Sequence, residues 1–286
     1  MNIINGLRLV AQQLSERKPV VNCYSVTSEC EKWHVYINLR DQRGRSLILN
    51  GLSQPLLSDV WETAVKYLSP DVVIDVGANY GEFGLGVQYK EGTKVLLVEA
   101  NPTLNRYLKK SIRSHPNSEA IELAEILACA PAMSGEKLDL FVDSRWSGYS
   151  SVIIPNNHTG RGTLVHCPCE TVDSFLHNEN CDSLVFKIDV EGYEGQVLEG
   201  MKNILTKPKS IFGIVEFNKE CLVSAGCDPH ELIRGLESIA TLYRVSNDGD
   251  AVLKKVERPS DIPEGKEDVV VCNDCSLVDK INGLSR

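Results

Sequence analysis

The chain has 286 residues, of which 42% are hydrophobic and 24% are charged, and its formal net charge is -9. This length is enough to bury the core of one large α/β domain, and the acidic balance argues against a broad phosphate-binding surface, so we expect no nucleic-acid partner. The sequence has no uninterrupted apolar run of the ~20 residues that a membrane span needs, and residues 1–19 lack the pattern of a signal peptide. We therefore expect a cytoplasmic protein without a membrane span.

The first seventy residues are predicted to form an extension that caps the rest of the chain. Residues 35–39 and 46–49 are short apolar stretches typical of strands, and a polar turn joins them. Apolar residues then recur at helical spacing over residues 58–68, and Pro70 ends this predicted helix. The division is thus an N-terminal extension over residues 1–70 and a main domain over residues 71–286.

From residue 71 onward, apolar runs alternate with helical patterns. The predicted strands are continuous apolar runs, as expected of strands covered on both faces, at residues 72–76, 94–99, 184–189, 210–216, 242–245 and 269–272. The predicted helices span residues 83–89, 104–114, 172–177 and 194–205. This alternation predicts an α/β fold with a mainly parallel sheet. The segment 143–162, rich in Ser, Gly and Asn, is predicted to be a substrate loop.

A glycine-rich turn follows the first of these strands, in the sequence DVGANYGEFG over residues 75–84. Glycines allow a tight turn and let the backbone approach a ligand where a Cβ would clash. The acidic Asp75 before the turn can hold an ammonium group or an ordered water, which suits a cofactor that carries an amino acid. The spacing Gly77, Gly81, Gly84 differs from the GxGxxG of dinucleotide-binding dehydrogenases, so it favours another cofactor.

A single carboxylate, Glu99, closes the next strand about twenty residues further on. A carboxylate at this point can accept hydrogen bonds from both ribose hydroxyls of an adenosine. Pro102 follows shortly and can set the first turn of a helix. The alternative interpretation is that Glu99 only caps this helix.

A third group of charged residues stands where two further strands end. Lys187 and Asp189 lie on the same side of their strand because side chains alternate, and Glu191 follows. The next strand ends in Glu216, with Asn218 two residues on. Adjacent parallel strands lie about 4.8 Å apart, so Asp189 and Glu216 are expected to face one crevice. The alternative is purely structural: a Lys187 salt bridge and a helix cap at Asp189.

Three segments together resemble the FkbM family of methyltransferases, namely IDVGANYGEFGLG, VEANP and FKIDVEGYEGQVLEGM. The resemblance covers about residues 56–205 in order and spacing. It implies a class I methyltransferase fold, which is Rossmann-like with a mostly parallel seven-stranded sheet and helices on both faces, and it makes residues 71–286 the catalytic domain. It also implies S-adenosyl-L-methionine as donor and a hydroxyl oxygen as acceptor. The cofactor-binding residues expected on this basis are Asp75, Gly77, Ala78, Asn79, Gly81, Glu99, Ala100, Asn101 and Asp189.

Methylation of a hydroxyl needs a base or a metal that removes the acceptor's proton. The candidate catalytic residues are Asp189, Glu191, Glu216 and Lys187. Three solutions stay open: one of these carboxylates acts directly, His166 acts from the loop side, or a divalent metal such as Mg²⁺ binds the alkoxide. In the last case the ligands are Asp189, Glu216 and Asn218, an oxygen-only set that suits a hard cation.

The expected partner is a small-molecule or glycan acceptor with a hydroxyl group, such as a sugar or a natural product. Trp146 and Tyr149 in the predicted substrate loop can stack on a sugar face. Two alternatives come from other functional classes. One is a nicotinamide-dependent oxidoreductase, in which Glu99 serves a ribose too, and the other is a catalytically inactive methyltransferase-like binding module.

Overall fold

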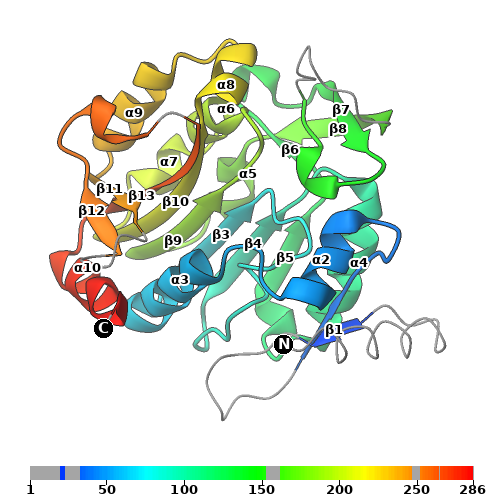
Figure 1. Ribbon diagram of the computed structural model, residues 1–286, viewed down its shortest axis with the longest axis horizontal. Coiled ribbons are helices and arrows are strands. Elements are labelled where there is room, and N and C mark those ends of the chain that lie inside the picture. Colours follow the sequence, from blue (N-terminus) through cyan, green and yellow to red (C-terminus); the bar gives the residue numbers. More distant parts are fainter. Residues whose placement is uncertain (1–19, 23–32, 153–161, 247–251, 264, 286) are drawn as a thin grey trace.

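The computed structural model describes residues 20–22, 33–152, 162–246, 252–263 and 265–285, and its centre is an eight-stranded sheet (Figure 1). In spatial order the strands are β12 (Leu253–Lys255), β11 (Thr241–Val245), β13 (Lys266–Cys272), β10 (Ser210–Asn218), β9 (Ser183–Ile188), β3 (Val72–Val76), β4 (Lys94–Val98) and β5 (Ile121–Ala124). The run from β10 to β5 is parallel, whereas β13 is antiparallel to both β10 and β11. Along the chain, β3, β4 and β5 follow one another toward one edge of the sheet. The next strand of this sheet, β9, pairs with the other side of β3.

Alternate residues of the strands enter two hydrophobic cores, one on each face of the sheet. Val73 of β3 belongs to the first core, whereas Val72 and Ile74 belong to the second. The first core includes residues of α3 (Pro55–Leu68), α4 (Pro102–Ser114) and α10 (Cys275–Asn282). The second includes residues of α5 (Val172–Leu176), α6 (Glu194–Glu199), α7 (Lys202–Leu205), α8 (Lys219–Ser224) and α9 (Pro229–Glu237). Burial on both faces explains why the strands are apolar at nearly every position.

The predicted α/β architecture, with a mostly parallel sheet and helices on both faces, is confirmed, although the sheet has eight strands instead of seven. All six predicted strands of the main domain are present, as β3, β4, β9, β10, β11 and β13. The helix predicted over residues 83–89 is wrong, because this segment forms turns and irregular backbone. The Gly84 N–H donates to the buried Asp75 carboxylate at 2.9 Å, and this long-range bond competes with a helical one.

The N-terminal segment contains β1 (Val20–Asn22) and β2 (His34–Tyr36), which pair antiparallel, followed by α2 (Gln42–Asn50) and α3. The predicted helix over residues 58–68 corresponds to α3, and the predicted strand over residues 35–39 overlaps β2. The strand predicted over residues 46–49 is wrong, because these residues belong to α2. Asp41 caps this helix by accepting from the Arg43 N–H at 3.1 Å, and a four-residue apolar run can lie on a helix as well as on a strand.

Residues 33–70 pack into the same core as the main sheet. Val60 and Trp61 of α3 share the first core with Val73 of β3. The Trp33 indole N–H donates to the Leu85 carbonyl at 2.6 Å. The extension therefore completes one face of the domain, and a boundary at residue 70 stays a prediction.

A second, three-stranded sheet lies beside the main one, in the order β6 (Leu127–Ala128), β8 (Gly162–Glu170) and β7 (Lys137–Asp143) (Figure 1). The predicted substrate loop runs from the end of β7 to the start of β8. It contains a short 3-10 helix, η3 (Ser147–Tyr149), and residues 153–161 lie outside the described part of the chain. No helix in the described ranges has both the length and the apolar character needed to cross a bilayer.

Candidate active site

A cavity of about 250 Å³ opens at the carboxyl ends of β3, β4 and β9. The order of the strands reverses here, since the chain continues from β3 to β4 on one side and β9 lies on the other. Open α/β sheets bind their ligands at such a point. One wall of the cavity is apolar, with Ile126, Leu127 and Leu140, and the others carry polar and charged side chains.

The glycine-rich turn forms the cavity wall next to β3. Gly77 and Asn79 line the cavity, and both have positive φ angles, 81° and 51°. The N–H groups of Gly77 and Ala78 donate to the Val98 carbonyl of β4 at 2.9 and 3.1 Å, which fixes the turn over the end of the sheet. Asp75 is 1% exposed beneath it, where burial raises the pKa of this carboxyl group to about 6.

Gly77 is required by the protein backbone itself. A Cβ at this position would collide with the backbone carbonyl of Asp189, at the end of β9. The positive φ angle adds strain for any other residue. The sequence suggested that a larger side chain here would fill the space of a cofactor; the structure shows that it would first push the ends of β3 and β9 apart.

Glu99 places a carboxylate in the cavity at the end of β4. Its two oxygens accept from the backbone N–H groups of Asn79 at 2.8 Å and Asn101 at 2.7 Å. Each oxygen keeps a second lone pair, so the carboxylate can still accept hydroxyl donors. Burial raises the pKa of Glu99 to about 7 against the effect of these two bonds.

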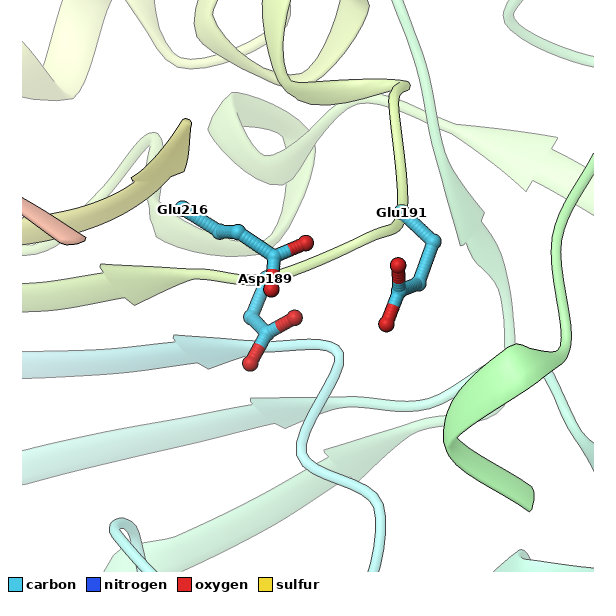
Figure 2. Close-up of side chains that lie close together, drawn as sticks. All are labelled: Asp189, Glu191 and Glu216. Atoms are coloured by element: carbon cyan, nitrogen blue, oxygen red, sulfur yellow. The ribbon is translucent and has the colours of Figure 1, made fainter. Parts of the chain in front are cut away.

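Three carboxyl groups gather on the other side of the cavity, from Asp189, Glu191 and Glu216 (Figure 2). One oxygen of each lies within 4.8 Å of the others. Asp189 and Glu191 line the cavity, whereas Glu216 lies on β10 and is only 1% exposed. The expected approach of Asp189 and Glu216 is therefore present. Such an oxygen set can bind a hard cation or hold a proton.

Two lysines balance these carboxylates. Lys187 is buried on β9, and its ammonium lies 2.6 Å from Asp189 Oδ2 and 4.8 Å from the centre of the Phe83 ring. Lys266 comes from the antiparallel strand β13, lines the cavity, and forms ion pairs with Glu216 and, at 3.2 Å, with Glu191. Burial alone would lower the pKa of Lys266, but Glu216 and its neighbours outweigh this and raise it, so the ammonium stays charged.

The loop after β9 presents Glu191 in an unusual conformation. Glu191 has a φ of 52°, and with Asn79 it is one of three non-glycine residues with positive φ in the described part of the chain. Such strain in residues that line a cavity is typical of functional sites. The buried Glu194 holds the loop by accepting from the N–H groups of Val190 at 3.2 Å and Gly192 at 3.1 Å. Burial raises the pKa of Glu191, with Asp189 adding to the shift and Lys266 opposing it.

The family model described as the methyltransferase FkbM domain matches residues 75–225, more than half of the chain. The chain belongs to the FkbM methyltransferase family. The class I methyltransferase fold that the sequence resemblance implied is thereby confirmed. The matched range contains the glycine-rich turn, Glu99 and all three clustered carboxylates.

Solved structures with a similar arrangement include other methyltransferases. An O-methyltransferase from Bacillus cereus in complex with SAH is 13% identical, over 77% of this chain and 81% of that chain, with a TM-score of 0.41. The O-methyltransferase TomG from Streptomyces achromogenes in complex with SAM is 8% identical, over 84% of this chain and 92% of that chain, with a TM-score of 0.42. A search of curated proteins finds no match. At these identities and scores, the structural similarity by itself assigns no activity.

The structure places the predicted site residues in two groups. Those that line the cavity are Gly77, Asn79, Glu99, Ala100, Asp189 and Glu191. Those that lie outside its lining are Asp75, Ala78, Gly81, Asn101, Lys187 and Glu216. The second group supports the first: Asp75 holds the glycine-rich turn, Asn101 donates to Glu99, and Lys187 pairs with Asp189.

The candidate metal ligand Asn218 and the candidate base His166 are placed elsewhere. Asn218 caps α8 by accepting from the Cys221 N–H at 3.3 Å, and Glu191 takes its place beside Asp189 and Glu216. His166 lies on β8, where it pairs with Asp139 across the β7–β8 hairpin. The His166 side chain is 77% exposed and is not among the cavity-lining residues, so the base is better sought among the carboxylates.

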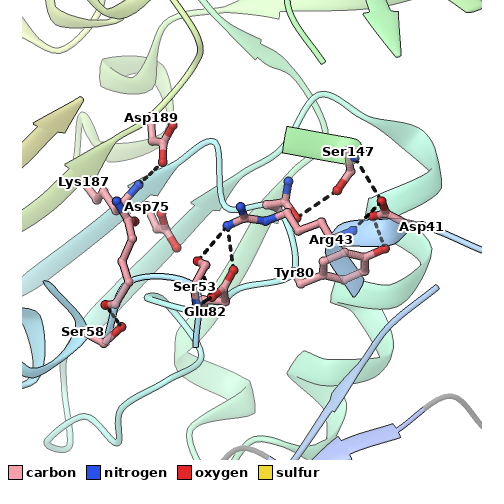
Figure 3. Close-up of polar contacts among 12 residues, drawn as sticks. Asp41, Arg43, Ser53, Ser58, Asp75, Tyr80, Glu82, Ser147, Lys187 and Asp189 are labelled. Atoms are coloured by element: carbon pink, nitrogen blue, oxygen red, sulfur yellow. Dashed lines mark hydrogen bonds and ion pairs between the residues drawn. The ribbon is translucent and has the colours of Figure 1, made fainter. Parts of the chain in front are cut away.

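No sequence pattern indicated the part of the cavity that the N-terminal segment and β13 build. Arg43 of α2 lines the cavity and is held by Glu82 at 2.7 Å and Ser53 at 3.4 Å (Figure 3). Asp41 links the segment to the substrate loop by accepting from the Ser147 N–H at 3.1 Å. Lys266 is separated in sequence from every predicted site residue, so only the folded sheet reveals it.

Proposed function

We propose that the chain is an S-adenosylmethionine-dependent O-methyltransferase that acts on a hydroxyl group of a sugar, a glycan or a natural product. One observation carries this proposal: a single cavity combines the Glu99 carboxylate, the Arg43 guanidinium and the acidic cluster around Glu191. These groups complement the ribose diol, the amino-acid carboxylate and the positive sulfonium of this cofactor. The match to the FkbM family favours this function over a nicotinamide-dependent oxidoreductase.

Glu99 and Arg43 are proposed to bind the two polar ends of the cofactor. Glu99 accepts from the ribose hydroxyls while its backbone bonds to Asn79 and Asn101 fix its position. The Arg43 Nε N–H is buried and has no hydrogen-bond partner in the described part of the structure, so it is a free donor for a carboxylate. The apolar wall with Ile126 and Leu140 suits an adenine ring.

Glu191 is the proposed general base. S-adenosylmethionine supplies an activated methyl group when bound, and the chain must align an acceptor oxygen and take its proton. Glu191 lines the cavity and has a raised pKa, which makes its carboxylate a stronger base than an ordinary one. Asp189 is a weaker base, because Lys187 outweighs the effect of burial and holds its pKa below the usual range.

The substrate loop is proposed to bind the acceptor. Ser147, Ser150 and Ser151 line the cavity and can bond to hydroxyl groups. Beside them, the rings of Trp146 and Tyr149 lie 6.0 Å apart, and Tyr149 is 61% exposed. An aromatic pair of which Tyr149 is exposed, next to serines that line the cavity, is suited to stacking on a sugar ring.

Calorimetric titration with S-adenosylhomocysteine and with NADH tests the cofactor, and we expect binding of the first only. Incubation with S-adenosylmethionine carrying a labelled methyl group and a panel of glycosides and alcohols then tests the reaction. We expect label in a methyl ether. Preferential binding of NADH would refute the cofactor assignment, and binding of S-adenosylhomocysteine without turnover of any acceptor would favour the inactive binding module.

A further inference from the structure

Burial and the neighbouring carboxylates of Asp189 and Glu191 raise the pKa of Glu216, and the ammonium of Lys266 opposes this shift. Glu216 is 1% exposed, and its oxygens have no hydrogen-bond partner in the described residues apart from the ion pair with Lys266. The carboxylates of Asp189 and Glu191 lie within 4.8 Å. A buried carboxylate with two like charges nearby is costly unless a positive charge compensates it. Lys266 provides this charge from the neighbouring strand.

The two lysines divide the three carboxylates between them. Lys187 contacts Asp189 from within β9, and Lys266 contacts both Glu216 and Glu191. Lys266 is therefore the cation that bridges two members of the cluster, which is the arrangement that a bound divalent metal would adopt. It also lines the cavity, so its ammonium is available to an acceptor oxygen.

We propose that the Lys266 ammonium occupies the cation position of the Asp189, Glu191 and Glu216 cluster, so that the protein holds an acceptor hydroxyl there without a divalent metal. The part about the acceptor rests on the proposed function, whereas the part about the cation does not. Lys266 acts as a positioning residue: it orients the Glu191 carboxylate and donates to the acceptor oxygen while Glu191 takes the proton.

The register of the sheet supports this placement. Lys266 lies opposite Asn218 in the antiparallel pair of β10 and β13, two positions from the pair of Glu216 and Asp268. Its side chain therefore projects from the start of β13 on the same side as Asp268, next to the end of β10. Gln54 donates to Asp268 Oδ2 at 2.9 Å, while Asp268 Oδ1 is buried without a hydrogen-bond partner in the described residues, so Asp268 is a further acidic group beside Lys187 and Lys266.

Binding of Mn²⁺ to the complete chain tests the proposal without any need for turnover. We expect the parent protein to bind no Mn²⁺ at the cluster, as measured by calorimetry and by the electron paramagnetic resonance signal of free Mn²⁺. Lys266→Met keeps the apolar stem, removes the charge and opens a three-carboxylate site, so it should bind one Mn²⁺ per chain where the parent binds none. The double variant Lys266→Met with Glu216→Gln should lose this binding.

Lys209→Met is the matched control, since it removes a surface lysine that pairs with the single carboxylate of Asp182 at 2.8 Å. It should bind Mn²⁺ no better than the parent. Circular dichroism shows whether each variant is folded. If Lys266→Met does not fold, the parent protein still tests the proposal, because Mn²⁺ bound at its cluster would contradict it. Mn²⁺ bound to the parent and lost in Glu216→Gln would overturn the proposal, as would a folded Lys266→Met that binds none.

Activity gives a second test once an acceptor is in hand. The parent should be indifferent to EDTA, whereas Lys266→Met should lose roughly 10²-fold in turnover and regain part of it with Mg²⁺ or Mn²⁺. A lysine with only a structural role would show no rescue by metal. Failure of the proposed function would appear separately, as absence of S-adenosylhomocysteine binding by the parent.

Discussion

The two halves of the cavity are built in different ways. The half at the ends of β3 and β4 is made by short continuous segments, and its shape depends on backbone groups and one carboxylate, Glu99. The half at the ends of β9 and β10 is made by side chains from four separate parts of the chain: α2, the loop after β9, β10 and β13. The first half has few charges, and the second holds clustered charges of both signs.

This difference separates binding from reaction. A site made by backbone geometry can be used by any member of a family for the same cofactor, because it depends little on the distant sequence. A site made by converging charged side chains changes when any one of the contributing elements changes. The matched family range, residues 75–225, includes the proposed cofactor half together with Asp189, Glu191 and Glu216, whereas Arg43 and Lys266 lie outside it.

The largest expected effect comes from the charged half. Glu191→Gln removes the proposed base but keeps the size of the side chain, so turnover should fall by roughly 10²–10⁴. The affinity for S-adenosylhomocysteine should stay within about threefold of the parent value, because the cofactor half is untouched. Initial rates and calorimetry measure the two quantities. A variant with full turnover would move the base to another residue.

The next effect concerns the backbone half. Gly77→Val places a side chain against the Asp189 carbonyl and forces a β-branched residue into a positive φ, so it should destabilise the fold by about 3 kcal/mol or more. Thermal unfolding followed by circular dichroism measures this. Gly92→Val is the control, since Gly92 has a similar positive φ but nothing within 4 Å of its Cβ position. If both variants lose the same stability, backbone strain at the positive φ explains the whole loss, and the contact with the Asp189 carbonyl contributes nothing.

The sequence predicted the backbone half well and the charged half only in part. Apolar runs, glycines and Glu99 are local signals, so β3, β4 and the turn between them could be located without a structure. Asp189 and Glu216 could be placed together because parallel strands end at one edge. The places of Arg43 and Lys266 depend on long-range packing, and no local pattern distinguishes them from surface residues. The same holds for residues 46–49, whose apolar run looks like a strand although it lies in a helix.

Arg43 offers a test of whether the two halves share the cofactor. Arg43→Met removes the proposed carboxylate partner, so S-adenosylhomocysteine should bind more weakly by about 1.5–3 kcal/mol. Methylthioadenosine lacks the amino-acid part and should bind to this variant as it does to the parent. Calorimetry with both ligands compares them directly. Equal losses for both ligands would show that Arg43 supports the cavity without contacting the amino acid.

The smallest expected effect is a pH dependence of cofactor binding to which Glu99 contributes. Burial raises the pKa of this group to about 7 from an ordinary value of 4.5, so in the free protein its contribution to stability is lost as the pH rises between these values. Ribose hydroxyls must donate to the ionised form, and therefore cofactor binding should strengthen over the same range. Between pH 6 and pH 8 the affinity for S-adenosylhomocysteine should rise by about tenfold.

Other acids near the cavity also titrate close to neutrality, including Glu194, whose pKa burial raises to about 7. The comparison with Glu99→Ala isolates the contribution of Glu99. This variant should bind S-adenosylhomocysteine more weakly at pH 8 by about 1.5–3 kcal/mol and should show a much flatter dependence on pH. If the parent and Glu99→Ala have the same pH profile and affinity, Glu99 does not bind the cofactor, and its carboxylate serves only to join the turn after β3 to the start of α4.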